Sequence, residues 1–242
     1  MTGNPAQVLT QPFDLLLYPN ICQICKSSGC NHGDGYVCRR CQKEVKKISK
    51  PWCTKCGAPH VDTQGPALCC DNCINMKFTK ARSLFVAQGL PRKIIHQLKY
   101  HQHEYFEPLI RKWLCNIFTL GLNLKPDAII PVPLHPIKER DRGINQAESI
   151  AQILSQCINT PVCSRLLKRT RATESQTNLT KTKRMTNTKN AFACVENALN
   201  GHFLIVDDVL TTGATASECA ETILNNGAAS AEVFTITRGG FL

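Results

Sequence analysis

The stretch Phe203-Leu204-Ile205-Val206-Asp207-Asp208-Val209-Leu210-Thr211-Thr212-Gly213-Ala214-Thr215 decides the fold. Its apolar start predicts a buried strand over 203–206, and a helix is predicted over 214–225. Two carboxylates and a turn rich in threonine and glycine lie between them. In an open parallel sheet, ligands bind in the crevice at the carboxyl ends of the strands. Backbone N–H groups at the helix start, with the threonine hydroxyls and a close approach at Gly213, therefore predict a nest for a phosphate monoester.

The two carboxylates indicate which phosphate compound this turn suits. Asp207 and Asp208 are unsuited to contacting the phosphate itself, but their oxygens can accept hydrogen bonds from a ribose 2′,3′-diol. The segment therefore suits a ribose-5-phosphate unit. The candidate binding residues are Asp207, Asp208, Thr211, Thr212, Gly213, Ala214 and Thr215.

Three other interpretations of the segment are weaker. A nucleoside-triphosphate loop would need the lysine of G-x4-G-K-[ST], which is absent here. A phospho-acceptor domain also places acidic residues at strand ends, but the glycine-threonine turn disfavours it. The plainest alternative is a capped helix that simply follows a buried strand.

Strands and helices alternate through the rest of the C-terminal part. Apolar runs predict further strands at 83–87, 128–132, 162–167 and 231–236. Helical periodicity is present over 90–118, interrupted or restarted at Pro108, and over 144–157. Residues 169–190 are polar and basic without an apolar period, so we expect a long loop there. This alternation predicts an α/β fold with a doubly wound, mostly parallel sheet.

The N-terminal part is dominated by cysteine. Ten of the fifteen cysteines lie between Cys22 and Cys73, and the other five are scattered singly like ordinary small buried hydrophobes. Each C-x2-C pair presents two thiolates from one turn, and two pairs complete the four-sulfur shell that zinc favours. Four pairs predict two structural zinc ions, with the candidate ligands Cys22, Cys25, Cys38, Cys41, Cys53, Cys56, Cys70 and Cys73.

The spacing leaves the ligand pairing open. The four pairs can combine in sequence or interleave, and Cys30, His32 or Cys69 can replace one of the eight ligands. An iron–sulfur cluster or unliganded buried cysteines are the alternatives to zinc. The expected organisation is a tail at 1–19, a zinc-binding module at 20–80 and an α/β domain at 81–242.

The charge and hydropathy of the chain indicate its kind of binding partner and its cellular compartment. The formal net charge is +11, and residues 161–190 hold eight basic residues against one acidic residue. A basic surface of this kind favours phosphates or nucleic acid. No apolar run approaches the roughly 18 residues that a membrane span needs, and no secretory signal is visible. We therefore expect a cytoplasmic protein without a membrane span, in which clustered cysteines bind metal rather than form disulfides.

Several segments resemble the ComF/GntX family, whose name derives from competence protein F. Residues 204–215 look like the phosphoribosyl-pyrophosphate signature of type I phosphoribosyltransferases. Ile95–Tyr100, Pro131–Pro136 and Arg140–Gln146 are similar to further family blocks, and 176–192 matches a weaker one. The resemblance covers roughly residues 15–240.

This resemblance implies ligands and a biological role. Phosphoribosyl pyrophosphate with Mg²⁺ is the implied ligand, and its pyrophosphate is expected to lie against Lys99, Arg140 and Arg142. The implied role is natural transformation, in which incoming single-stranded DNA is handled with a DNA-uptake machinery. Two hypotheses follow: a DNA-handling protein whose pocket binds phosphoribosyl pyrophosphate without turnover, and an active phosphoribosyltransferase with an unknown acceptor. The absence of a segment typical of a base-recognition hood favours the first.

Overall fold

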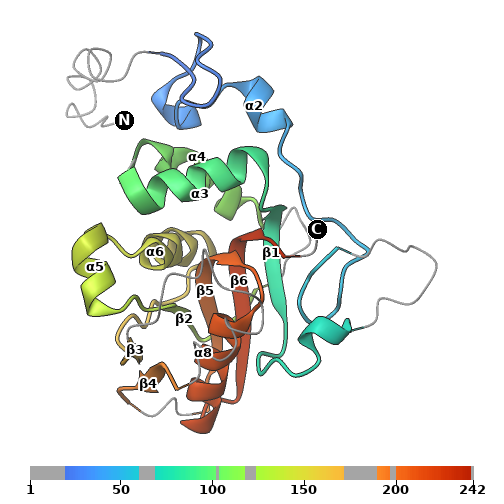
Figure 1. Cartoon of the computed structure of the whole chain (residues 1–242), viewed down its shortest axis with the longest axis vertical. Helices are drawn as coiled ribbons and strands as arrows, with labels where there is room; N and C mark the ends of the chain where they lie inside the picture. Colours follow the sequence, from blue (N-terminus) through green and yellow to red (C-terminus); the bar gives the residue numbers. More distant parts are fainter. Residues whose placement is uncertain are drawn as a thin grey trace, which may run out of the picture.

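Four parallel strands form the central sheet of the molecule (Figure 1). The computed structural model describes residues 20–59, 69–101, 104–117, 124–171, 190–196 and 200–240. In spatial order the strands are β1 (Ala81–Val86), β6 (Ser230–Arg238), β5 (His202–Leu210) and β2 (Ala128–Pro131). Every pairing between these neighbours is parallel. The predicted fold class is therefore confirmed.

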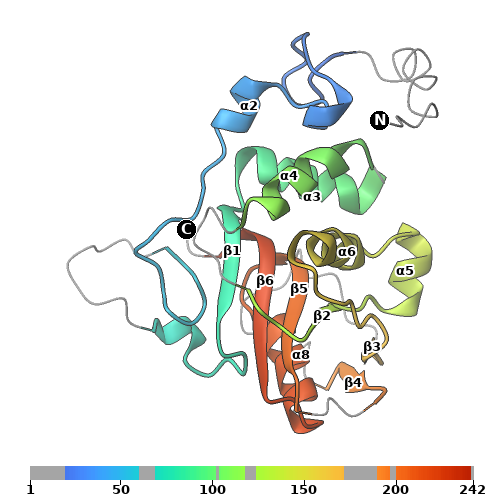
Figure 2. The same ribbon diagram turned by 180° about the vertical axis from the view of Figure 1, so that it is seen from behind.

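Helices cover both faces of this sheet. Leu204 and Val206 of β5 share one core with α3 (Gly89–His101), α4 (Glu107–Cys115) and α6 (Gln146–Ile158). Phe203 and Ile205 share a second core with α8 (Ala214–Asn225). Neighbouring residues of a strand point to opposite faces, which explains this division. Figures 1 and 2 show α6 between β5 and the pair α3–α4.

Most predicted elements have the expected positions. The helical stretch from residue 90 divides as expected: α3 ends at His101, a short 3-10 turn η4 spans Glu104–Phe106, and α4 begins at Glu107. Pro108 lies in the first turn of α4, where the missing N–H costs nothing. Helix α8 has the predicted bounds of 214–225.

The strand predicted at 162–167 is wrong in its extent. Val162 makes a single parallel bridge to Ile129, and the chain then turns at residues 164–165. Strand β3 (Leu167–Arg169) begins after that turn and pairs antiparallel with β4 (Phe192–Cys194) in a separate small sheet. Residues 172–189 of the predicted basic loop lie outside the described residues.

Two of the singly scattered cysteines are paired, contrary to expectation. Cys115 in α4 and Cys157 in α6 form a disulfide, with their Cα atoms 5.0 Å apart. The two helices pack side by side, which brings together residues 42 positions apart. Cys219, by contrast, is a buried apolar residue of α8, as the sequence predicts.

The cysteine-rich part contains short elements. They are the 3-10 turn η2 (His32–Asp34), the short helix α2 (Arg39–Lys43) and the 3-10 turn η3 (Asp71–Cys73). Among the described residues, none of the helices has the length and apolar character needed to cross a membrane.

Candidate functional site

The two aspartates of the predicted ribose site lie within β5 rather than after it. The strand continues to Leu210 because β6 runs alongside and pairs Leu210 with Arg238. Asp208 is buried, with 5% of its surface exposed, and Asp207 is half-buried. Burial raises the pKa of Cys219 in α8, and the charge of Asp207 adds to that effect.

The turn after β5 leaves the start of α8 open to an anion. Gly213 occupies the N-cap position with φ of 80° and has no side chain to cap the helix. The first turn of α8 carries no acidic residue. The N–H of Ala214 donates to Oγ1 of Thr212, at 3.4 Å. The N–H groups of this turn and the positive end of the helix dipole can therefore bind an anion such as a phosphate.

The predicted pyrophosphate segment begins beside β5. Val132, just after β2, donates its N–H to the carbonyl of Val206, at 2.9 Å. Asn145 Nδ2 donates to the carbonyl of Val132, at 3.2 Å, and Gln146 Nε2 donates to that of Leu98, also at 3.2 Å. The segment after β2, the start of α6 and the second half of α3 are thus held together beside Val206 of β5.

Of the three cationic side chains predicted to bind pyrophosphate, the structure describes only one. Arg140 and Arg142 belong to a short helix, α5 (Pro136–Arg142), that was not among the predicted elements. Pro136 in its first turn and Gly143 after its end were the overlooked signals. Arg140 is exposed, whereas the side chains of Arg142 and of Lys99 in α3 lie outside the described residues.

The first cysteine cluster has the dimensions of a zinc shell. The Sγ atoms of Cys22, Cys25, Cys38 and Cys41 all lie within 4.8 Å of one another. The Cys25–Cys38 and Cys22–Cys41 sulfur distances are 3.6 and 4.0 Å. Four sulfurs bound tetrahedrally to one zinc lie about 3.8 Å apart. These residues therefore fit the metal.

The second cluster fits equally well. Its members are Cys53, Cys56, Cys70 and Cys73, and the Cys53–Cys73 and Cys56–Cys70 sulfur distances are 3.5 and 3.6 Å. The N–H groups of Cys56 and Cys70 donate to the sulfur of Cys53 at 3.4 and 3.3 Å. Although burial raises the pKa of Cys53, these backbone hydrogen bonds bring it down to about 6. They stabilise the thiolate that a metal requires.

The structure combines the C-x2-C pairs in chain order. Each cluster uses two consecutive pairs, so an interleaved arrangement is not what the geometry favours. Cys30 is buried in the same core as the first cluster but is not part of its four-sulfur group. His32 is exposed on η2, outside the four-sulfur group. Cys69 lies 3.4 Å from Cys73, sulfur to sulfur, as a fifth thiol beside the second cluster.

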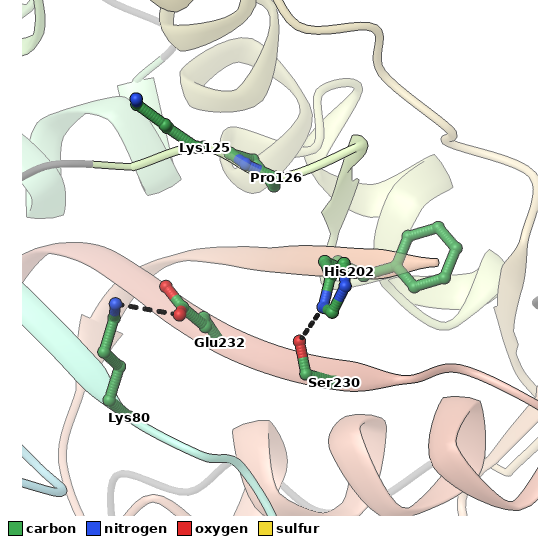
Figure 3. Close-up of a pocket in the computed structure, with 7 residues that line it drawn as sticks. Lys80, Lys125, Pro126, His202, Ser230 and Glu232 are labelled. Atoms are coloured by element: carbon green, nitrogen blue, oxygen red, sulfur yellow. Dashed lines mark hydrogen bonds and ion pairs between the residues drawn. The ribbon is translucent and has the colours of Figure 1, made fainter. Parts of the chain in front are cut away.

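A pocket of about 190 Å³ lies at the opposite edge of the sheet (Figure 3). It is formed where the strands begin, with His202 hydrogen-bonded to Ser230 at 2.9 Å and Lys80 paired with Glu232 at 2.8 Å. Ligands of parallel sheets bind at the carboxyl ends instead. This pocket is therefore separate from the ribose-phosphate loop, residues 211–215.

Comparison with known proteins agrees with both parts of the structure. A double zinc ribbon domain matches residues 14–74, and a phosphoribosyl transferase domain matches residues 96–240. DNA utilization protein YhgH of Escherichia coli (strain K12) is 34% identical over 231 residues, which are 93% of this chain and 99% of the relative. Competence protein F of Haemophilus influenzae is 30% identical over 214 residues, with 84% and 90% of the two chains covered.

The chain belongs to the ComF family. A third relative, competence protein ComFC of Bacillus subtilis, is 26% identical over 215 residues, with 85% of each chain covered. The cysteine-rich part of this ComF-family chain is accordingly a zinc-binding double ribbon, and the sheet with its helices is a phosphoribosyltransferase-type domain.

Proposed function

We propose that this ComF-family chain handles incoming single-stranded DNA in natural transformation and binds phosphoribosyl pyrophosphate at the end of β5. The family relatives named for competence and DNA utilization support the biological role. The observation that carries the ligand assignment is the uncapped start of α8 beside two aspartates. The role is exercised in the cytoplasm, together with a DNA-uptake machinery.

The ligand is held in three parts. Thr211, Thr212, Gly213, Ala214 and Thr215 surround the 5-phosphate with N–H and hydroxyl groups. Asp207 and Asp208, near the end of β5, accept hydrogen bonds from the ribose hydroxyls. Lys99, Arg140 and Arg142 neutralise the pyrophosphate. Asp207 and Asp208 in β5 carry the oxygen donors that would hold Mg²⁺, and the ion would supply positive charge next to the pyrophosphate.

Active phosphoribosyl transfer is the second candidate. The match of a phosphoribosyl transferase domain to residues 96–240 favours it, because the match includes every residue of the proposed pocket. Turnover would release pyrophosphate when an acceptor is present. Pyrophosphate release from phosphoribosyl pyrophosphate, measured with single-stranded DNA or nucleobases as acceptors, separates this candidate from binding alone.

Ligand binding is tested by thermal unfolding. Phosphoribosyl pyrophosphate with Mg²⁺ should raise Tm, since a ligand that binds only the folded state stabilises it by mass action; at 100 times Kd the gain is about 2.7 kcal/mol. Asp207→Asn and Asp208→Asn should each reduce this shift. Glu232→Gln is the matched control, because it removes a carboxylate from the opposite edge of the sheet. A shift that all three variants share with the parent would contradict the ribose assignment.

DNA binding is tested by its dependence on salt. The affinity for single-stranded oligonucleotides should fall with salt by about 0.7 log units per log unit for each phosphate neutralised. Replacing Lys181, Lys183 and Arg184 by glutamine should flatten this slope by about two units. The shift in Tm with phosphoribosyl pyrophosphate should stay as in the parent. An unchanged slope would assign the loop to the ligand pocket and favour the transferase.

A further inference from the structure

Arg238, the last residue of β6, connects the second zinc cluster with the ribose-phosphate loop. The residue is buried, with 6% of its surface exposed. Its Nη2 lies 3.8 Å from Sγ of Cys56. Its Nη1 donates to the carbonyl of Leu210 at 2.9 Å and to that of Thr211. One guanidinium thus contacts a candidate zinc ligand, the last residue of β5 and the first residue of the loop.

The segment after the second cluster contacts the same loop from another side. A Cβ atom at Gly213 would lie 3.5 Å from Sδ of Met76 and 3.7 Å from the ring of Phe78. The N–H of Lys77 donates to Oγ of Ser217, in the first turns of α8, at 3.0 Å. These three residues follow Cys73 closely in the chain. The position of the loop therefore depends on the position of the second cluster.

The charge of a filled cluster gives Arg238 its partner. One Zn²⁺ with four thiolates carries a net charge of −2, and a charge buried in protein requires a paired or hydrogen-bonded counter-group. A second arginine, Arg82, donates to the carbonyl of Thr54, next to Cys53, at 3.0 Å and to that of Ala81 at 2.6 Å. Removal of the metal removes the fixed anionic centre that Arg238 faces. The guanidinium of Arg238 is then held less firmly, and so are its hydrogen bonds to the carbonyls of Leu210 and Thr211.

The first cluster has no such connection within the described residues. Its surroundings are the helices: Lys112 of α4 pairs with Asp34 at 3.6 Å, and Tyr36 packs on Tyr105. It belongs to the hydrophobic core on the α4–α6 side, whereas the second cluster belongs to the core on the α8 side.

We propose that Arg238 couples the second zinc cluster to the ribose-phosphate loop, so that metal bound by Cys53, Cys56, Cys70 and Cys73 holds residues 211–215 in the ligand-binding arrangement. Arg238 is a positioning residue, since it acts through the loop backbone. The ligand part of this inference rests on the proposed function. The coupling between cluster and loop does not, because it can be measured without ligand.

Hydrogen exchange of the full-length, ligand-free protein tests the coupling. Arg238→Lys keeps the charge but lacks the planar fork that reaches Cys56 and the carbonyls together. We expect amides 211–217 to exchange about tenfold faster in this variant, while elemental analysis still finds the zinc content of the parent. Cys70→Ser, which empties the second cluster at a distance from Arg238, should accelerate the same amides. Cys25→Ser, the matched change in the first cluster, should leave them at the rate of the parent.

The dissociation constant for phosphoribosyl pyrophosphate provides the second measurement. It should rise about tenfold in Arg238→Lys. Unchanged loop exchange in Cys70→Ser overturns the proposal even where Arg238→Lys fails to fold. Equal acceleration by Cys25→Ser overturns it as well, since the effect would then be general loosening. The two proposals can fail separately. If the parent binds no phosphoribosyl pyrophosphate, the proposed function is wrong. If Arg238→Lys and Cys70→Ser still accelerate the exchange of the loop amides, the coupling stands.

Discussion

The two zinc clusters have nearly the same sequence pattern and very different surroundings. Each consists of two C-x2-C pairs, separated by twelve residues in the first cluster and thirteen in the second. The first lies over α4, where Gly35 approaches Leu109 and Tyr36 packs on Tyr105. The second lies beside β1 and β6, in the core that also contains α8 (Figure 1). One motif therefore packs on the helices α4 and α6 in one place and in the core with α8 in the other.

The largest expected difference comes from removing one ligand from each cluster. Cys22 and Cys53 are both fully buried, so their serine variants are matched. Elemental analysis should find about two zinc ions per chain in the parent and about one in each variant. Cys53→Ser should lower the free energy of unfolding by about 4 kcal/mol or more, because a metal is lost from the core of the sheet.

Cys22→Ser should open the first cluster while the sheet remains closed. Hydrogen exchange would then show fast amides at 20–48 and protected amides in β5 and β6. Limited proteolysis should give the same division. If both variants expose the same amides, the two clusters do not differ in the way that their packing indicates.

A second comparison uses two phenylalanines of equal burial. Phe78 is 1% exposed next to the second cluster, and Phe106 is 0% exposed at the start of α4. Each change to alanine should lower the free energy of unfolding by about 3–4 kcal/mol, since both leave a large cavity. Chemical denaturation measures this loss. Only Phe78→Ala should also weaken the binding of phosphoribosyl pyrophosphate beyond the loss in stability, because its ring lies against Gly213.

The smallest expected effects come from two glycines with positive φ. Gly35 has φ of 61°, and a Cβ there would lie 3.0 Å from Cβ of Leu109 and 3.2 Å from the carbonyl oxygen of Tyr105. Gly213 has φ of 80°, and its nearest neighbour would be Met76 at an ordinary 3.5 Å. Gly35→Ala should therefore cost about 2 kcal/mol and Gly213→Ala about 1 kcal/mol in thermal unfolding. An equal or reversed order would contradict the tighter packing of the first cluster on α4.

Local patterns predicted the elements whose signals are strong. The bounds of α8 follow from an apolar period that starts after Gly213 and ends before Gly227. The break near Pro108 follows from the missing N–H of proline. The short pieces α5, β3 and β4 were harder, because three to seven residues carry too little periodicity to separate a helix or strand from a loop. The strand predicted at 162–167 failed because a turn at 164–165 ends its pairing with β2 after one bridge.

The sequence by itself determined the chemistry of the two sites: thiolate pairs at the spacing of zinc ribbons, and a carboxylate, threonine and glycine turn between a strand and a helix. These depend on residues close together in the chain, whose geometry is set by local turns. Only the tertiary structure decided the strand order, the disulfide between Cys115 and Cys157, and which of the two clusters contacts Arg238. Arg238 illustrates the reason: it reaches Cys56 across 182 positions of sequence, and such a contact depends on packing of the whole sheet rather than on any pattern around either residue.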